Sequence, residues 1–160
     1  MKPVRPDALR EAMARFPTAV TVVTAMGPNG PAGATANAVA SLSLEPPMML
    51  AALDLGSRTL VAVEHAQRFG INVLASPQAD IARRFSTKDP HPEKWGGVRW
   101  SQQAGVPRIE GALIWVACEL SDAHQGGDHV IVTGLVTELE AGGGEPLLFL
   151  GGEYRPVESR

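Results

Sequence analysis

Apolar and β-branched residues fall into several short runs along the chain, which is the pattern of a protein built mainly from β-strands. The run at residues 18–26 is rich in valine and threonine, which favour extended backbone. An Asn29-Gly30 pair follows it, and this dipeptide is typical of a hairpin turn. The predicted strands are residues 18–26, 48–53, 69–74, 109–121, 129–139, 147–150 and 153–155.

A smaller part of the chain shows helical spacing. Near the N-terminus, Leu9, Met13 and Phe16 recur at the period of one helix face, and Asp7 precedes them as a candidate N-cap. Pro77 stands where a later helix would begin, and proline is common in the first turn. The predicted helices are residues 6–16, 59–66 and 78–85.

The order of these elements predicts the fold class. Because no regular helix separates consecutive strands, a doubly wound parallel sheet is not expected. We predict a mainly β fold, a largely antiparallel barrel with a few appended helices, in one domain across residues 1–160. Residues 88–97 contain two prolines and two glycines, so we expect this segment to be irregular and exposed.

Composition and charge exclude several classes of protein. The net charge of −3 and the lack of a Lys/Arg run argue against nucleic-acid binding. No apolar run approaches the ~20 residues that span a bilayer, and the N-terminus does not resemble a signal peptide. The single cysteine, Cys118, lies in an apolar run and is expected to be buried. A lone cysteine suits a reducing compartment, so we expect a cytoplasmic protein without membrane association.

Motifs for several common chemistries are missing from the sequence. No Gly-x-Gly-x-x-Gly follows a strand, and no Walker-type phosphate loop is present. The four histidines, His65, His91, His124 and His129, do not have metal-ligand spacing, so we expect no metal site. Ser57 does not lie in a nucleophile-elbow motif, which argues against acyl transfer.

One stretch of small residues, 33–50, stands out as a candidate binding segment. Thr35, Asn37, Ser41 and Ser43 carry its short polar side chains, and the Pro46-Pro47 pair ends it. Small side chains allow a ligand to approach the backbone, whose amides pair with phosphate and carbonyl oxygens. We expect a strand here that becomes a loop around Asn37. An ordinary surface loop followed by a strand is the alternative.

Ser57-Arg58-Thr59 lies where a helix is predicted to begin. Unpaired N–H groups at a helix start favour an anion, and arginine adds a charged fork. A plain helix cap is the alternative. In the segment 88–97, Lys88, His91 and Lys94 could also meet a cofactor phosphate, although a solvated loop is the favoured interpretation.

Two further candidates lie near the ends of predicted strands. His129, preceded by Asp128, stands at a strand start from which an imidazole can project into a cleft. Tyr154 is the only tyrosine and, beside Arg155, could stack on a planar ligand. A structural or solvated histidine and an ordinary edge contact are the respective alternatives.

Taken in this order, the motifs resemble those of the short-chain flavin reductase family, the small components of two-component flavin-dependent monooxygenases. The similarity extends from about Leu9 to Val157. The motifs that carry it are the segment 34–47, Ser57-x-Thr59, the Phe-Gly-Ile-Asn-Val-Leu run at 69–74, Pro107 with Gly111-Ala112, Gly127-Asp128-His129-x-Ile131, and Gly152-x-Tyr154-Arg155.

The resemblance implies an FMN-binding split β-barrel, usually a homodimer with flavin near the subunit interface. It implies that Thr35, Ala36, Asn37, Ala38 and Ser41 line the isoalloxazine and ribityl chain. The remaining residues implied at the site are Ser57, Arg58 and Thr59 at the phosphate, Phe85 and Ser86 beside the flavin, His129 facing the nicotinamide as the catalytic candidate, and Tyr154 and Arg155 shaping its pocket. Relatives often carry serines where this chain has Asn37 and Ala38.

The function implied is that of an NAD(P)H:flavin oxidoreductase. NADH or NADPH would reduce FMN, FAD or riboflavin by hydride transfer, and the product would pass to a separate oxygenase. Because the cofactors carry the chemistry, the protein supplies position and electrostatics. The alternatives are a flavin carrier or sensor without turnover on the same barrel, and an oxidase of the pyridoxamine-phosphate type. The last would need more basic residues at the site.

Overall fold

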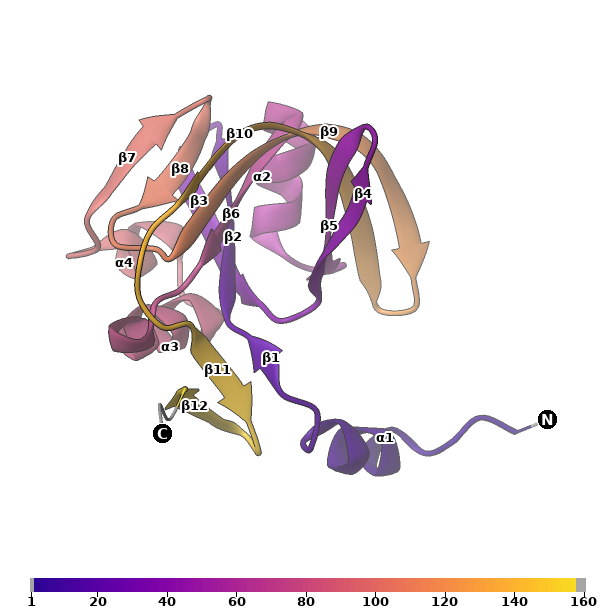
Figure 1. The fold of residues 1–160 in the computed structure, drawn as a ribbon. Coiled ribbons are helices and arrows are strands. Elements are labelled where there is room, and N and C mark those ends of the chain that lie inside the picture. Colours follow the sequence, from indigo (N-terminus) through magenta and orange to yellow (C-terminus); the bar gives the residue numbers. More distant parts are fainter. Residues whose placement is uncertain (1, 158–160) are drawn as a thin grey trace.

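The main sheet of the protein has seven antiparallel strands in the order β3-β2-β6-β9-β10-β5-β4 (Figure 1). The computed structural model describes residues 2–157. The sheet curves strongly, so that β3 also contacts β5. Its strands are β2 (Thr21–Gly27), β3 (Gly30–Ala36), β4 (Val39–Leu44), β5 (Pro47–Asp54), β6 (Arg68–Val73), β9 (Ile114–Gly126) and β10 (His129–Ala141).

Two smaller sheets complete the β structure. One has the order β1-β11-β12 and the other is the hairpin β7-β8. Their strands are β1 (Thr18–Ala19), β11 (Leu147–Leu150), β12 (Glu153–Pro156), β7 (Trp100–Gln103) and β8 (Val106–Ile109). The helices are α1 (Pro6–Met13), α2 (Arg58–Ala66), η1 (Ser76–Gln78), α3 (Ala79–Ser86) and α4 (His91–Trp95).

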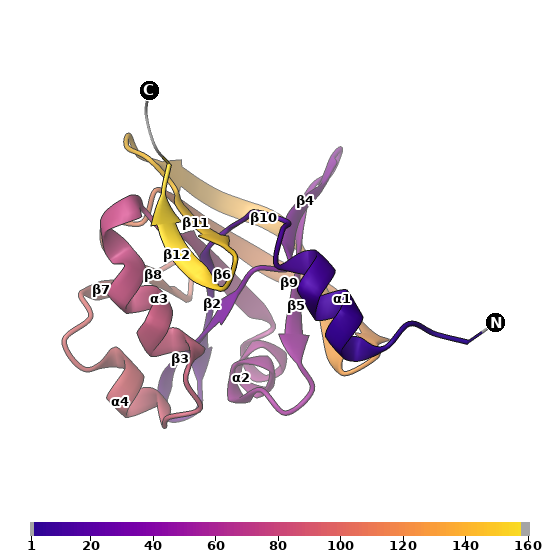
Figure 2. The same ribbon diagram turned by 90° about the horizontal axis from the view of Figure 1, so that it is seen from below.

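Two buried apolar clusters hold these layers together. In the first, Leu60 and Val63 of α2 pack with Val23, Ile71 and Val116 of the main sheet. The second joins Phe85 of α3 and Trp95 of α4 to Val22 of β2, Ile109 of β8 and Leu147 of β11. Figure 2 shows the result, with α3 and α4 on one side of β2 and β3, and α2 on the other. The site described below lies where these helices meet the ends of the strands.

A glycine permits the close approach of α3 to β3. A Cβ at Gly33 would lie 2.7 Å from Cε1 of Phe85 and 3.3 Å from the Trp95 ring. Both rings are buried and contact each other edge-to-face, with centroids 4.8 Å apart. The small residues of this strand therefore let two aromatic side chains press against its backbone.

The structure confirms the predicted fold class, a mainly antiparallel β structure with appended helices. It also confirms that the chain leaves the strand at Asn37, although the predicted loop is only a short break before β4 begins at Val39. Cys118 is buried as predicted, which raises the pKa of its thiol to about 12. Among residues 2–157, none of the helices is long and apolar enough to cross a membrane.

Several element predictions were wrong. The predicted strand 18–26 is divided at Val20 into β1 and β2, which belong to different sheets. The backbone N–H of Val20 donates to the carbonyl of Leu147 in β11, so this part of the chain pairs with the smaller sheet. The predicted strand 109–121 is two strands, β8 and β9, because Gly111 turns the chain with φ +78°. Residues 88–97 are not simply irregular, since they contain α4.

Candidate functional site

A cavity of about 880 Å³ opens between the curved sheet and the helices. The end of β3, the β5–α2 connection and the segment from α3 to α4 form most of its wall, and single side chains of β10, β11 and β12 complete it. Predicted site residues that line it are Thr35, Ala36, Asn37, Ala38, Ser57, Arg58, Thr59, Phe85, Ser86, His129 and Tyr154.

The small-residue segment forms one wall of this cavity. The Thr35 hydroxyl donates to the carbonyl of Ala82 at 2.7 Å, which ties the end of β3 to α3. Beyond it, Asn37 lies in the connection to β4, and its side-chain oxygen has no hydrogen-bond partner within the described residues. Ser41 does not line the cavity, because β4 leaves as the exposed edge of the sheet. Its predicted contact with flavin therefore finds no support in the single chain.

The start of α2 forms the floor of the cavity. The Ser57 hydroxyl accepts a hydrogen bond from the Thr59 amide at 3.2 Å and acts as the N-cap. The Thr59 side chain is 1% exposed, yet its hydroxyl has no partner in the described part of the chain. A buried hydroxyl without a partner costs free energy, and this one lies in the turn of α2 that borders the cavity.

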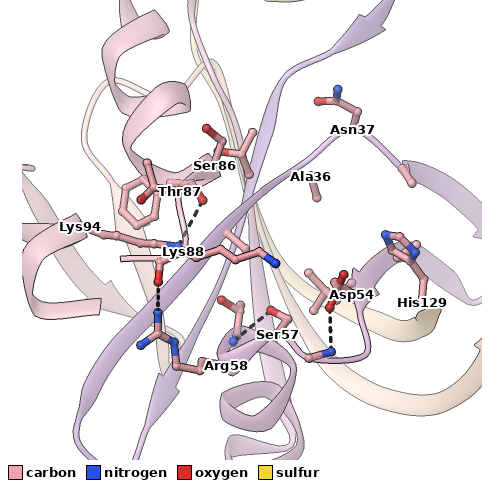
Figure 3. Close-up of a pocket in the computed structure, with 18 of the residues that line it drawn as sticks. Ala36, Asn37, Asp54, Ser57, Arg58, Ser86, Thr87, Lys88, Lys94 and His129 are labelled. Atoms are coloured by element: carbon pink, nitrogen blue, oxygen red, sulfur yellow. Dashed lines mark hydrogen bonds between the residues drawn. The ribbon is translucent and has the colours of Figure 1, made fainter. Parts of the chain in front are cut away.

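Arg58 points from the same turn toward the segment that follows α3 (Figure 3). Its Nη2 donates to the carbonyl oxygens of Lys88 and Asp89, each at 2.6 Å. The guanidinium thus fixes the backbone of residues 88 and 89 beside the start of α2.

Three basic residues reach the cavity from that segment and from α4. Lys88 is exposed, and Figure 3 shows its side chain extending into the pocket toward Ser57 and Asp54. Lys94 is only 5% exposed, and its amine donates to the Phe85 carbonyl at 3.4 Å. Burial, followed by the charge of Arg58, lowers the pKa of Lys94.

His91 lies beside these charges. Burial, then Lys94 and Arg58, lowers its pKa, although the adjacent backbone of Arg58 slightly favours the protonated ring. Neither ring nitrogen makes a hydrogen bond of normal geometry to any described residue.

His129 begins β10 on the opposite side of the cavity (Figure 3). Its Nδ1 lies 2.7 Å from Oδ1 of Asp128, and this hydrogen bond lowers the pKa of the Asp128 carboxyl. Because an ionised carboxylate only accepts, Nδ1 carries the proton and Nε2 is left for a ligand. Asp54 pairs with His129 in the sheet, and its Oδ1 accepts from the Gly56 amide at 2.7 Å.

Aromatic side chains close the remaining side. Phe149 and Tyr154 contact each other with ring centroids 5.3 Å apart, and the Arg83 guanidinium lies 5.6 Å from the Tyr154 ring. Arg155 does not line the cavity. It alternates to the other face of β12 and pairs with Glu153 at 2.8 Å, so its predicted role at the pocket finds no support here.

The sequence does not indicate the whole of this site. Asp54 reaches the cavity because β5 pairs with the distant strand β10, and Phe149 because β11 pairs with β12. Lys88, His91 and Lys94 line the cavity, where the sequence favoured a solvated loop. The helical pattern after Pro90 and the apolar Trp95 were the available signals for α4. Within residues 2–157, no cluster of three or more His, Cys, Asp or Glu side chains could hold a metal ion.

The donor set fits a flavin nucleotide. Small residues leave space for a planar ring along the end of β3, and the polar residues Asn37 and Thr59 line the cavity at separate points. The start of α2 and the side chains of Lys88 and Lys94 supply positive charge for a phosphate. The volume lies within the ~300–1,000 Å³ typical of small-molecule sites.

Comparison with known proteins gives a consistent result. A family profile described as flavin reductase like domain matches residues 13–158. The reductase subunit HsaB of a flavin-dependent monooxygenase from Mycobacterium tuberculosis is 37% identical over 159 residues, covering 97% of this chain and 84% of that protein. An NADH-dependent flavin reductase from Rhodococcus sp is 34% identical, covering 97% and 88%. The structure of the NADH:FAD oxidoreductase SgcE6 from Streptomyces globisporus C-1027 superposes with a TM-score of 0.90 at 32% identity, covering 99% of each chain.

Proposed function

The chain belongs to the flavin reductase-like domain family, and we propose that it is an NAD(P)H-dependent flavin reductase that supplies reduced flavin to a separate monooxygenase. The observation that carries this proposal is the cavity, which combines a small-residue wall, a helix start rich in donors and an imidazole facing it from β10. Relatives across nearly the whole chain are named as NADH-dependent flavin reductase and as monooxygenase reductase subunit.

The residues present divide the work of binding. Backbone and side chains of Thr35 to Ala38 would lie along the flavin ring and its ribityl chain, and the start of α2 would face the phosphate. When bound, the flavin accepts a hydride from the nicotinamide. The protein therefore has to hold the two rings in contact and exclude water, for which Phe85 and Tyr154 provide apolar walls.

His129 is the candidate for orienting the nicotinamide. With Nδ1 held by Asp128, its Nε2 can accept a hydrogen bond from a carboxamide N–H. We propose this role for His129 rather than proton transfer to a reacting atom, because hydride transfer to a flavin needs positioning above all.

The test is the oxidation of NADH or NADPH in the presence of catalytic amounts of FMN, FAD or riboflavin. A reductase consumes nicotinamide nucleotide in air with each turnover of flavin and bleaches added flavin when oxygen is absent. A carrier or sensor on the same barrel would change the flavin spectrum without oxidising the nucleotide. Failure of both readouts would refute the proposal. The same assay ranks NADH against NADPH and FMN against FAD.

We also propose a homodimer of a single domain. The support is an apolar surface that the single chain leaves uncovered. Helix α1 stands apart from the sheets, and none of its residues is buried (Figure 1). The edge strand β4 exposes Leu42 and Leu44 beside unpaired backbone groups. The lone, buried Cys118 supports our further proposal of a reducing, cytoplasmic location.

A further inference from the structure

Three aromatic side chains contact one another between the cavity and the surface of the protein. Phe85 of α3 lines the cavity and contacts Trp95 of α4 edge-to-face, with ring centroids 4.8 Å apart. Trp95 in turn contacts Trp100, the first residue of β7, with ring centroids 5.2 Å apart. Figure 1 shows α4 in the corresponding place, between α3 and the β7–β8 hairpin. The rings therefore form a continuous aromatic path that leads away from the cavity.

The exposure of the rings to water increases along this path. Phe85 is 1% exposed and Trp95 6%, whereas Trp100 is 36% exposed. The path thus begins at the wall of the ligand space and ends at solvent. Movement of an electron requires rings in contact rather than an accessible polar atom, so the buried inner rings are suited to it.

The types of side chain on the path suit the transfer of single electrons. Tryptophan gives up an electron more readily than phenylalanine, because its indole ring is the more electron-rich of the two. Phe85 can therefore provide contact between the cavity and Trp95 without being oxidised itself. Flavins carry out one-electron chemistry, and a flavin that has absorbed light is a strong oxidant. A flavin bound in the cavity would withdraw an electron from Trp95 when it is illuminated.

The buried indole N–H of Trp95 favours onward movement of the positive charge that oxidation leaves on the ring. Its Nε1 is only a donor, and it has no hydrogen-bond partner among residues 2–157. Without an acceptor, the proton stays on the ring and the charge stays buried, which is unfavourable. An electron from Trp100 relieves this cost. At the exposed Trp100 ring, water can stabilise the charge and accept the indole proton.

Two other aromatic residues provide comparisons for this path. Trp115 is also buried with an unpartnered Nε1, but it packs with Val106 and Ala117 and does not line the cavity. It is therefore a matched control. Tyr154 lines the cavity and can also be oxidised, but its ring contacts Phe149, which lines the same cavity. Tyr154 is therefore a competing electron donor whose contribution has to be measured separately.

We propose that Trp95 and Trp100 form an electron path through which a flavin in the cavity, when excited by light, is reduced at the expense of an external thiol. The excited flavin gains one electron from Trp95, and Trp100 then gives one electron to Trp95 and releases its indole proton to water. A thiol restores Trp100 with one electron and one proton, and two thiols oxidised in this way join as a disulfide. The inference rests on the proposed function, since a flavin has to bind in the cavity. It adds a light-driven activity that requires no nicotinamide nucleotide.

The first experiment measures the fluorescence lifetime of bound FMN without a nicotinamide nucleotide. Wild type, Trp95→Phe, Trp100→Phe and Trp115→Phe are compared with protein in excess, so that the FMN is bound. We expect Trp95→Phe to lose most of the quenching shown by the wild type, because phenylalanine keeps an aromatic ring but removes the indole. Trp100→Phe and Trp115→Phe should keep it, because Trp95 is still present.

The same lifetimes are measured in a second series that also carries Tyr154→Phe, which removes the competing donor at the cavity. Trp95→Phe should lengthen the lifetime in this series as well. Equal lifetimes with and without Trp95 in both series would overturn the proposal. If Trp95→Phe does not fold, the test depends on Trp100→Phe in the experiment that follows, since Trp100 lies at the surface.

The second experiment follows the bleaching of bound FMN under steady light, without oxygen and with dithiothreitol as the thiol. We expect Trp95→Phe and Trp100→Phe to lose most of the bleaching that wild type and Trp115→Phe show. Without Trp100, the electron returns from the flavin to Trp95 before a thiol can reach the buried ring. Bleaching that persists unchanged in Trp100→Phe would show that the thiol acts directly on the flavin and would overturn the path.

Oxidation of NADH in the dark separates this inference from the proposed function. Trp100→Phe should oxidise NADH at the wild-type rate, because Trp100 lies outside the cavity. If NADH reduces flavin in the dark but the tryptophan variants match wild type under light, the function stands and the electron path is refuted. If bleaching under light depends on Trp100 but NADH is not oxidised, the path stands and the function fails. Failure of FMN to bind refutes both.

Discussion

Arg58 and Thr59 are adjacent in sequence, yet they serve the site in different ways. Arg58 is exposed and bonds backbone carbonyls, whereas Thr59 is buried with a hydroxyl that has no partner in the described chain. The same turn thus holds the backbone of residues 88 and 89 through Arg58 and places Thr59 beside the cavity. A motif such as Ser-x-Thr identifies the turn, but the direction of each side chain decides its role.

His129 is the residue whose replacement should affect the nicotinamide most. We expect His129→Ala to raise the KM for NADH roughly three- to tenfold and to lower kcat moderately, because the imidazole positions the nicotinamide without carrying the hydride. Steady-state kinetics at saturating FMN measure both constants. Asp128→Asn should have a smaller effect in the same direction, since it changes only the partner of Nδ1. Unchanged constants in His129→Ala would contradict the assignment.

His91 should make stability depend on pH in the acidic range. Burial first, and then Lys94 and Arg58, lowers its folded-state pKa below the ordinary value of 6.5. The unfolded chain therefore binds more protons between those two pKa values, so stability falls as pH drops below 6.5 and levels off below the folded pKa. Above 6.5 the ring is neutral in both states and has no such effect.

The measurement is urea unfolding of the wild type and His91→Gln between neutral and acidic pH. We expect the variant to lose part of the pH dependence, while His65→Gln, at an exposed position of α2, keeps it. Saturating FMN should flatten the wild-type profile as well, since a bound phosphate favours the protonated ring. Identical profiles for wild type and His91→Gln would show that this ring does not couple to folding.

At the scale of elements, the contact between β3 and α3 sets the position of the cavity wall. A Cβ at Gly33 would lie 2.7 and 2.9 Å from two atoms of the buried Phe85 ring. We expect Gly33→Ala to cost about 1–3 kcal/mol, because the buried Phe85 ring would have to shift out of its packed position. The shift of α3 should also weaken FMN binding. Gly143→Ala is the matched control, since its Cβ would meet nothing within 4 Å.

Chemical unfolding and flavin titration of the two variants provide the measurement. A Gly33→Ala protein as stable as Gly143→Ala would show that Phe85 and α3 shift at little cost to make room for the added methyl group. A loss of stability without loss of FMN affinity would instead show that the wall of the cavity does not depend on this contact.

Local pattern identified most elements, and the errors share a physical cause. The run of apolar and β-branched residues predicted the long strand β10, whose start at His129 is confirmed. The prolines around His91 indicated an irregular segment, yet Pro92 occupies the first turn of α4, where its missing N–H costs nothing. At the end of α4, Trp95 is buried against Phe85, a contact that local pattern does not contain.

The sequence likewise identified the polar residues at the ends of single elements, but not those that reach the site through pairing between strands. Ser57, Thr59 and His129 could be found because polar residues at the ends of elements are typical of binding sites. Asp54 reaches the cavity because β5 pairs with β10, and Phe149 because β11 folds back beside β12. Ser41 and Arg155 were placed at the site by resemblance. Ser41 lies away from the cavity of the single chain because β4 is the edge strand of the sheet, and Arg155 because it alternates with Tyr154 along β12.

At the scale of the whole molecule, the uncovered apolar surface predicts the oligomeric state. Leu44 is 88% exposed and Leu42 47% exposed on an edge strand, and Phe16 after α1 is 60% exposed. We expect light scattering to give twice the chain mass of 16.9 kDa. We expect the double variant Leu42→Lys/Leu44→Lys to shift the protein toward the single-chain mass, because two buried lysines at an interface would be left without partners.

The control for this experiment is Val61→Lys, an exposed apolar position on α2, which should leave the mass unchanged. Comparison of FMN affinity in the two variants then tests whether the partner subunit completes the site. Ser41 lies on the same edge strand as both leucines, so dissociation of the dimer should also weaken FMN binding if a partner chain brings this strand to the flavin. A wild type that runs at the single-chain mass at all concentrations would contradict the dimer and leave Ser41 without a role at the site.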